Sequence, residues 1–223
     1  MKVGVLFSGG KDSVFSSYKA KNQGHELNCL ISVHSENEES YMFHTPSISK
    51  TRLQAELMEV PLFEWRTEGE KESELEDLRE AIKYAKENYG IEGIVTGAVR
   101  SQYQGSRIQN ICDGLGLEVI NPLWWKNEFE YLKELLESDF KVILTAVRAY
   151  PFDKSWLGKE IDEEFVEKIK GLNEKYDIHP AGEGGEFETF VLNCPLFSRE
   201  IEVKDWKDFE EGEFTHSREI EVS

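Results

Sequence analysis

Short apolar runs alternate with segments of helical spacing over the first 121 residues. In one such segment Leu75, Leu78 and Ile82 recur every three or four positions, which predicts a helix with one buried face. The apolar runs predict strands at residues 3–7, 27–33, 62–65, 93–95 and 117–120, and the periodic segments predict helices at residues 12–22, 47–58, 75–88 and 106–115. This alternation predicts an α/β fold, with a parallel sheet covered by helices on both faces.

The pattern changes after Pro122. The remaining chain predicts helices at residues 129–136 and 161–176, and strands at residues 141–145, 188–193, 197–203 and 215–222. We therefore predict two domains, a nucleotide-binding domain of residues 1–121 and a smaller α/β domain of residues 122–223 that binds the substrate.

Composition narrows the function. The chain has 26 Lys and Arg against 44 Asp and Glu, a net charge of −18, which argues against direct binding of nucleic acid. Its three cysteines are far apart, so neither a disulfide framework nor a zinc knuckle is expected. No apolar run approaches the ~20 residues of a membrane span, and Met1 leads directly into the first predicted strand. We expect a cytoplasmic protein without a membrane anchor.

The segment Ser8-Gly9-Gly10-Lys11-Asp12-Ser13, here called the phosphate loop (residues 8–13), follows the first predicted strand and opens a helix. Free N–H groups at a helix start attract an anion, and glycines let the backbone approach it. Two hydroxyls and the Lys11 ammonium add to a phosphate site, whereas Asp12 suits a Mg²⁺ ion that bridges to the phosphates. Neither GxxxxGK[ST] nor GxGxxG is present. The alternative is an ordinary glycine turn.

Two other stretches follow predicted strands. Residues 96–104 place Gly97 and Arg100 at the same edge of the sheet as the phosphate loop, where they are candidates for nucleotide contacts. Residues 35–45 form a polar, aromatic-rich stretch suited to holding a substrate, although a lone His44 is more often structural. A solvated loop is the alternative for residues 96–104.

A further stretch, Ala181 to Thr189, is here called the glutamate segment (residues 181–189). In it Glu183, Glu186 and Glu188 alternate with glycines, so the carboxylates are expected to converge on a cation, an amine or an ammonium ion. The alternative is an acidic surface turn.

Taken together, these motifs resemble a known family. Residues 8–13 (SGGKDS) resemble the signature of the PP-loop ATP pyrophosphatases, which cleave ATP between the α- and β-phosphates. Residues 183–189 (EGGEFET), with a looser likeness at residues 96–104 and 40–45, resemble the diphthine–ammonia ligase branch of that superfamily. The resemblance implies a Rossmann-like fold of the adenine nucleotide alpha hydrolase type, plus the smaller C-terminal domain.

The resemblance also implies an activity. It is that of an AMP-forming ligase that makes a C–N bond: diphthine on translation elongation factor 2 is adenylated with ATP and Mg²⁺, and ammonia displaces AMP to give diphthamide. The partners would be diphthine-bearing elongation factor 2, ATP and ammonium, and a homo-oligomer stays open. The residues implied are Asp12, Lys11, Glu183, Glu186 and Glu188 for catalysis, Asp12 for the metal, Ser8, Gly9, Gly10, Lys11, Asp12, Ser13, Gly97 and Arg100 for the nucleotide, and Tyr41, His44, Thr45, Tyr103, Gln104, Glu183, Glu186 and Thr189 for the substrate.

Three rival functions remain. A tRNA-modifying PP-loop enzyme, such as a thiolase or a lysidine-type ligase, would favour a basic face, and a thiolase would want paired cysteines. A PP-loop enzyme that amidates another small carboxylate would keep the same motifs. A nucleotide-binding module of the universal-stress type, which lacks catalysis, would need neither motif.

Overall fold

The computed structural model describes residues 1–35, 50–67 and 73–223, with backbone alone at residues 73 and 102–104. The chain divides into two compact units: the first holds Met1–Ser8 and Asp12–Trp124, and the second holds Gly9–Lys11 and Trp125–Ser223. The phosphate loop thus contributes residues to both units. No helix in the described ranges has the length and apolar character needed to cross a membrane.

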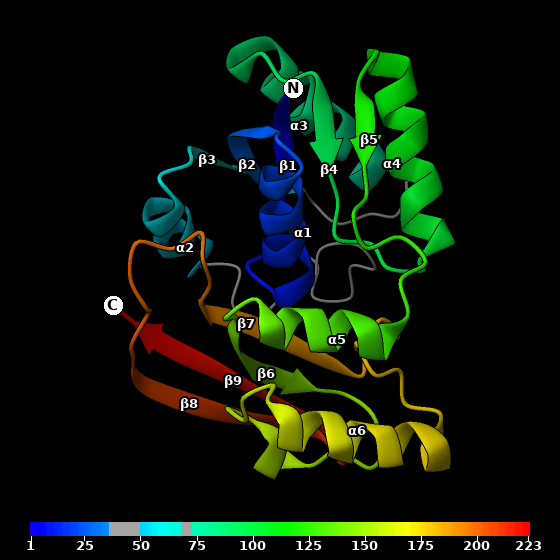
Figure 1. The fold of residues 1–223 in the computed structure, drawn as a ribbon, viewed down its shortest axis with the longest axis vertical. Helices are drawn as coiled ribbons and strands as arrows, with labels where there is room; N and C mark the ends of the chain where they lie inside the picture. Colours follow the sequence, from blue (N-terminus) through cyan, green and yellow to red (C-terminus); the bar gives the residue numbers. More distant parts are fainter. Residues whose placement is uncertain (36–49, 68–72) are drawn as a thin grey trace. The chain divides into compact units, whose positions relative to one another are not determined.

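The first unit is built on a parallel sheet. Its five described strands lie in the order β3-β2-β1-β4-β5, and every neighbouring pair is parallel (Figure 1). The strands are β1 (Lys2–Leu6), β2 (Glu26–Ser35), β3 (Leu62–Thr67), β4 (Gly93–Val95) and β5 (Glu118–Ile120). The predicted α/β class with a parallel sheet is confirmed.

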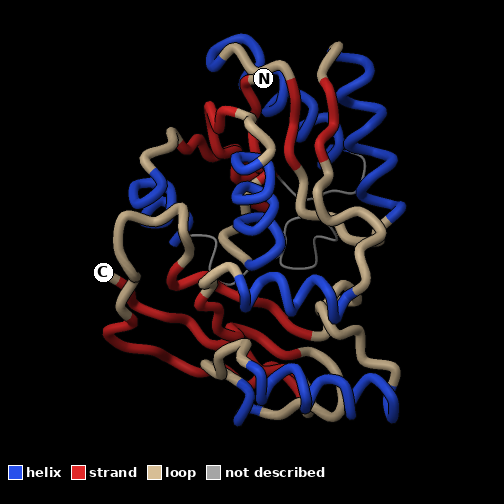
Figure 2. The backbone as a smooth tube through the Cα atoms, in the orientation of Figure 1, coloured by secondary structure: helices blue, strands red, loops and turns tan. Residues whose placement is uncertain are grey.

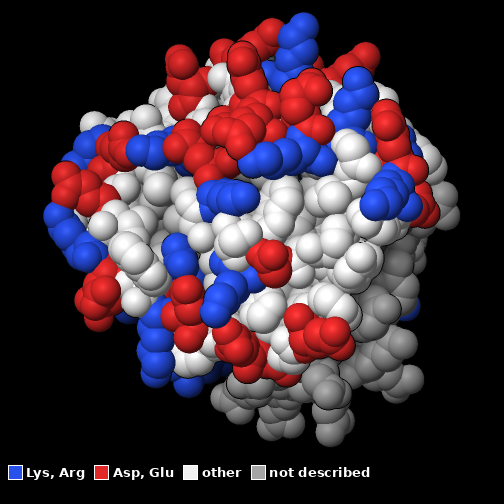
Figure 3. All heavy atoms as spheres, turned by 90° about the horizontal axis from the view of Figure 1, so that it is seen from below, with Lys and Arg blue, Asp and Glu red and all other residues white. Residues whose placement is uncertain are grey.

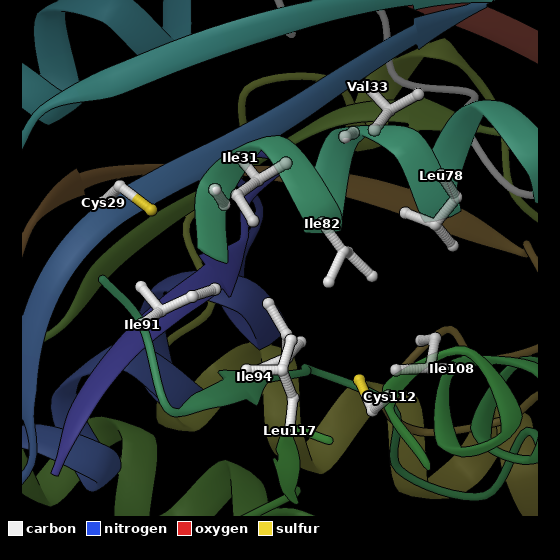
Figure 4. Close-up of a cluster of buried hydrophobic side chains, with 12 residues drawn as sticks. Cys29, Ile31, Val33, Leu78, Ile82, Ile91, Ile94, Ile108, Cys112 and Leu117 are labelled. Atoms are coloured by element: carbon white, nitrogen blue, oxygen red, sulfur yellow. The ribbon is translucent and has the colours of Figure 1, made fainter. Parts of the chain in front are cut away.

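Helices pack on this sheet through apolar faces. The described helices of the first unit are α1 (Lys11–Asn22), α2 (Thr51–Met58), α3 (Ser73–Tyr89) and α4 (Gln102–Leu115). Leu78 and Ile82 of α3 and Cys112 of α4 are buried in one cluster with side chains of β2 and β4 (Figure 4). Because crossovers between parallel strands are right-handed, α1 and α2 cover the face opposite α3 and α4.

The order of the strands fixes where a ligand is expected. The chain steps outward from β1 to β2 and β3, then returns to β4 on the other side of β1, so the connection reverses between β1 and β4. Ligands of such sheets bind beyond the carboxyl ends of the strands at this reversal. Ser8 follows β1 there and Thr96 follows β4. The sheet thus brings the two predicted nucleotide-contacting stretches to one edge.

Gly97 has a packing role at this edge. A Cβ atom at residue 97 would lie 2.8 Å from the carbonyl carbon of Asp12 and 3.0 Å from the amide nitrogen of Ser13. The chain after β4 therefore passes against the first turn of α1, and a larger residue at position 97 would displace that turn.

The second unit is a different layer structure. Its four strands form an antiparallel sheet in the order β7-β6-β9-β8, accompanied by helices α5 and α6 (Figures 1 and 2). The elements are α5 (Glu128–Glu137), β6 (Lys141–Val147), the 3-10 turn η2 (Lys154–Trp156), α6 (Glu163–Tyr176), β7 (Phe187–Asn193), β8 (Val203–Gly212) and β9 (Thr215–Val222). Most were predicted within a few residues of these bounds.

One predicted strand is wrong. Residues 197–202 form no strand, and the real strand, β8, begins at Val203 and continues to Gly212. The backbone of this segment bonds to the end of β7 instead. Phe197 N–H donates to Cys194 O in a turn, and Ile201 N–H donates to Leu192 O. Strand β8 was missed because nearly all its positions are exposed and six of its ten residues are charged, which leaves no alternation of buried and exposed positions to detect.

Candidate functional site: the phosphate loop and the glutamate segment

The phosphate loop begins with a serine pair in the first unit. Ser13 Oγ lies 3.3 Å from Ser8 Oγ and accepts a hydrogen bond of 3.3 Å from Ser8 N. Between them Gly9 has a φ of 79°, a left-handed conformation that favours glycine. The hydroxyl of the first helical turn thus turns back toward the end of β1 and closes the loop.

The middle of the loop is bonded to the second unit's edge strand, β7. Gly9 O accepts a hydrogen bond of 3.2 Å from Val191 N, and Lys11 N donates one of 3.1 Å to Thr189 Oγ1. Strand β7 is the end strand of its sheet. The Gly9 carbonyl therefore pairs the Val191 N–H of an edge strand, whose outward backbone groups have no neighbouring strand among the described residues to bind.

The Lys11 side chain is buried within the second unit, to which Lys11 belongs. Lys11 is 3% exposed, and its Nζ donates a 2.6 Å hydrogen bond to Ala181 O. The same ammonium lies 5.5 Å from the ring centre of Phe187 and 5.9 Å from that of Tyr131. A carbonyl dipole and two aromatic faces thereby compensate part of the cost of burying a cation.

His179 organises the turn that receives Lys11. Its Nδ1 accepts hydrogen bonds from Ala181 N at 3.2 Å and from Glu183 N at 3.4 Å. Its own backbone N–H donates a 2.9 Å bond to Glu186 Oε1. On the other side of the ring, Nε2 lies 3.4 Å from Glu128 Oε1 of α5. One imidazole thus fixes the start of the glutamate segment.

Two glycines of the segment leave room for neighbouring side chains. Gly182 has a φ of 70°, and a Cβ there would lie 3.0 Å from the ring of Phe187. A Cβ at Gly184 would lie 2.8 Å from Glu186 Oε1. The glycines therefore make room for the side chains of the segment itself, a reason for them that does not depend on a ligand.

Glu188 has partners distinct from those of Glu186. Its carboxylate lies 3.3 Å from both Nε and Nη2 of Arg148, and Arg148 Nη1 lies 3.5 Å from Glu211 Oε2. Burial raises the pKa of Glu188 to about 7; Arg148 lowers this pKa in opposition, and Glu211 raises it further. Among the described residues Glu188 Oε2 is buried without a hydrogen-bond partner, which fits a carboxyl group that is partly protonated near neutral pH.

The carboxylates of Glu186 and Glu188 are directed to different partners. Glu186 binds the His179 backbone, Glu188 binds Arg148, and strand alternation turns Glu188 away from the side of β7 on which Thr189 meets the loop. Within residues 1–35, 50–67 and 73–223, no group of three or more His, Cys, Asp or Glu side chains is arranged to hold a metal ion.

The other predicted residues fall into three sets. Asp12, Gly97 and Arg100 belong to the first unit, at the edge where β1 and β4 end, and Gly10 belongs to the second. Tyr41, His44 and Thr45 lie outside the described residues, as do the side chains of Tyr103 and Gln104. Sequence reasoning missed His179, Arg148 and Glu128, none of which stands in a recognisable motif.

Replacing Thr189 with Val tests the bond between the loop and β7. Valine keeps the shape but removes the acceptor of Lys11 N–H, and a buried donor left without this acceptor costs about 1–3 kcal/mol. We expect Thr189→Val to lower the free energy of unfolding in urea by that amount. The control is Thr145→Val in β6, whose buried Oγ1 has no hydrogen-bond partner among the described residues, so this change is expected to be neutral or stabilising. Equal losses in the two variants would contradict the bond.

Glu188 predicts a pH-dependent stability. In the unfolded chain its pKa is near the ordinary 4.5, and in the folded chain it is about 7. The folded state therefore binds more protons between these values, and stability falls as the pH rises through this window, by up to about 3 kcal/mol. Because Glu188→Gln removes this dependence, the urea midpoint of the variant should rise relative to that of the wild type between pH 5 and pH 8. Glu219→Gln, an exposed change in β9, is the control, and an unchanged difference between wild type and Glu188→Gln across this range would refute the assignment.

Comparison with known proteins agrees with this arrangement of motifs. The family model of the diphthamide synthase N-terminal domain matches residues 1–119, and that of the C-terminal domain matches residues 127–220. The chain is 36% identical over 222 residues to a diphthine–ammonia ligase of Mus musculus, covering 91% of this chain and 83% of the mouse protein.

Two further proteins extend the comparison. A diphthine–ammonia ligase of Schizosaccharomyces pombe is 36% identical over 221 residues, which cover 92% of this chain and 36% of the yeast protein. A predicted subunit of a tRNA methyltransferase from Methanocaldococcus jannaschii superposes with a TM-score of 0.47 at 20% identity, over 87% of this chain and 98% of that one. The two family models together account for most of the chain, which therefore belongs to the diphthamide synthase family.

Proposed function

We propose that the protein catalyses the ATP-dependent amidation of diphthine on translation elongation factor 2. Relatives that are 36% identical to the chain, and of which it covers 83%, are named diphthine–ammonia ligase. One structural observation carries the proposal for this chain: the two motifs that define the resemblance are joined by the Lys11 bonds to Ala181 and Thr189. The phosphate loop and the glutamate segment are thus hydrogen-bonded to each other, which supports a shared role in one site.

ATP is proposed to bind at the phosphate loop. Its phosphates would be held by the backbone N–H groups of Gly9 and Gly10 and by the hydroxyls of Ser8 and Ser13, at the N-terminus of α1. The reversal of strand order between β1 and β4 supports this location. Arg100, which follows β4, would stabilise the charge of the departing pyrophosphate.

Mg²⁺ is proposed to bind at Asp12 together with the phosphates of ATP. Mg²⁺ is usually held by one or two carboxylates plus substrate phosphates and water, so a single Asp12 carboxylate with the phosphates of ATP suits it. The ion would supply charge neutralisation on the phosphates. Asp12 suits this task because it lies within the phosphate loop, in the first turn of α1.

The reaction has two steps. A carboxylate oxygen of diphthine attacks the α-phosphorus of ATP, forming a C–O–P link as the bond to pyrophosphate breaks. Ammonia then attacks the acyl carbon, a C–N bond forms, AMP leaves, and one proton is released. Lys11 would act by holding the loop in position, since its ammonium is bonded to Ala181 O.

The substrate contacts are proposals that follow the family resemblance. Glu183 is proposed to provide the negative charge that a trimethylammonium or ammonium group prefers. Glu186 and Glu188, which are bonded to the His179 N–H and to Arg148, are proposed to contribute by fixing the shape of the segment. Glu183 is presented from an ordered turn, since its N–H is held by His179 Nδ1. The remaining proposed contacts with diphthine are Tyr41, His44, Thr45, Tyr103, Gln104 and Thr189.

Observations on cysteine and charge count against the tRNA-modifying rivals. All three cysteines are buried and unpaired, and burial raises the thiol pKa of each to about 12, so a reactive thiolate is disfavoured at neutral pH. On the face shown in Figure 3, basic side chains are scattered among acidic ones and form no continuous patch within the residues drawn in colour. The net charge of −18 acts in the same direction. A protein substrate and a cytoplasmic location stay our predictions.

One assay tests the proposal. The protein is incubated with ATP, Mg²⁺, ammonium and diphthine-bearing elongation factor 2, and AMP is measured together with the mass of the modified factor. We expect one AMP for each carboxyl group converted to a carboxamide. ADP as the product would refute the pyrophosphatase chemistry, and AMP without modification of the factor would refute the substrate.

A matched pair of variants tests Asp12 in the same assay. Asp12→Asn is expected to reduce AMP formation by about 10²-fold or more, because the carboxylate that positions the metal is lost. Asp113→Asn removes the same charge from an exposed position of α4 and should leave the rate unchanged. Normal turnover by Asp12→Asn would remove Asp12 from the mechanism.

A further inference from the structure

We infer that His179 is a positioning residue for ATP binding: through Nδ1 it fixes Ala181 so that the Ala181 carbonyl receives Lys11 of the phosphate loop. The inference rests on the proposed function in one respect, since it takes ATP to bind at that loop. No motif of the sequence marks His179, and every contact used below lies within the second unit.

The hydrogen bonds define the state of the imidazole. Nδ1 accepts from two backbone donors, Ala181 N at 3.2 Å and Glu183 N at 3.4 Å. A ring nitrogen that accepts carries no proton, so the proton of the neutral ring is on Nε2. Nε2 lies 3.4 Å from Glu128 Oε1 without forming a hydrogen bond to any described residue, and the nearby carboxylate favours a proton on Nε2.

The backbone of His179 is fixed as well as its ring. Its N–H donates to Glu186 Oε1 at 2.9 Å, and its carbonyl accepts from Gly182 N at 2.9 Å. The acceptor Nδ1 therefore has little freedom to follow the turn if the turn moves.

Ala181 connects the two ends of the link. Its N–H binds His179 and its carbonyl oxygen binds Lys11 Nζ at 2.6 Å, while the residue itself is 1% exposed. Releasing the N–H would let the peptide groups around Ala181 rotate, and the carbonyl would then turn away from the ammonium. Losing that acceptor would weaken the interactions that hold the buried Lys11 ammonium in its present position.

Lys11 sets the geometry of the loop because its backbone is bonded too. Lys11 N donates to Thr189 Oγ1, and two residues earlier Gly9 O accepts from Val191 N. Movement of Lys11 would therefore disturb the N–H groups of Gly9 and Gly10 that are proposed to bind phosphate. The role of His179 is to set this geometry before ATP arrives, which lowers the cost of binding.

Two substitutions separate this role from a general role in stability. Asn at position 179 places an acceptor oxygen near the Nδ1 position, whereas Gln carries its amide farther out, near Nε2. We expect His179→Gln to raise the Kd for ATP about tenfold, as two hydrogen bonds are lost, and His179→Asn to stay within about threefold of wild type. Affinity is measured by calorimetric titration of the full chain with ATP and Mg²⁺, without ammonium or elongation factor 2, so that no turnover occurs.

The control is His216→Gln. His216 is buried in the second unit, and its Nδ1 has no hydrogen-bond partner among the described residues, so ATP affinity should be unchanged. A purely structural role of His179 would lower the melting temperature of the Gln variant while its Kd at a lower temperature matched wild type, and this result would overturn the inference. A tenfold higher Kd of His179→Asn for ATP would also overturn the inference. This second criterion applies even if His179→Gln does not fold.

The outcome is independent of the amidation assay. If the wild type amidates diphthine and His179→Gln binds ATP normally, the inference fails and the proposed function stands. If the wild type binds ATP but forms no carboxamide, the proposed function fails, and the Kd values of the Asn and Gln variants still decide the role of His179.

Discussion

The bonds between Gly9–Lys11 and strand β7 are the constraint on which the candidate site depends. A glycine-rich loop after a strand has many accessible conformations, and an anion binds tightly only where the N–H groups are already oriented. Here the loop carbonyl of Gly9 and the amide of Lys11 are both bonded to the edge of the antiparallel sheet. The sheet of the second unit thereby supplies the rigidity that the loop lacks on its own.

The same constraint gives the glutamate segment a function that its composition conceals. Its alternation of glycines and carboxylates resembles a flexible acidic loop, yet Gly182 packs against Phe187 in a left-handed conformation and Glu186 binds the backbone of His179. The segment forms a socket for the Lys11 ammonium, lined by the Ala181 carbonyl and the Phe187 ring. The glutamate segment therefore has a structural role, which is to hold the Lys11 side chain in place.

The sequence predicted the first unit well because its signals are local. Apolar runs of a parallel sheet, the periodic face of α3 and the glycines after β1 are each visible within a few residues. Strand β8 was missed because it is exposed on nearly all positions. The site was harder to predict, because the partners of Glu186 and Glu188 are set by tertiary contacts. His179 precedes Glu186 in an irregular turn. Arg148 follows β6, the strand that pairs with the strand of Glu188. A single His and a single Arg outside any motif give no sequence pattern from which these contacts could be predicted.

Amide hydrogen exchange of the protein without nucleotide tests the central claim most directly. The N–H of Val191 lies on an edge strand, where it would exchange rapidly if the phosphate loop were not bonded to it. The account predicts that Val191 N–H and Lys11 N–H are protected to the degree of the amides in the β6–β7 ladder. Exchange of these two amides as fast as the exposed amides of β8 would contradict it.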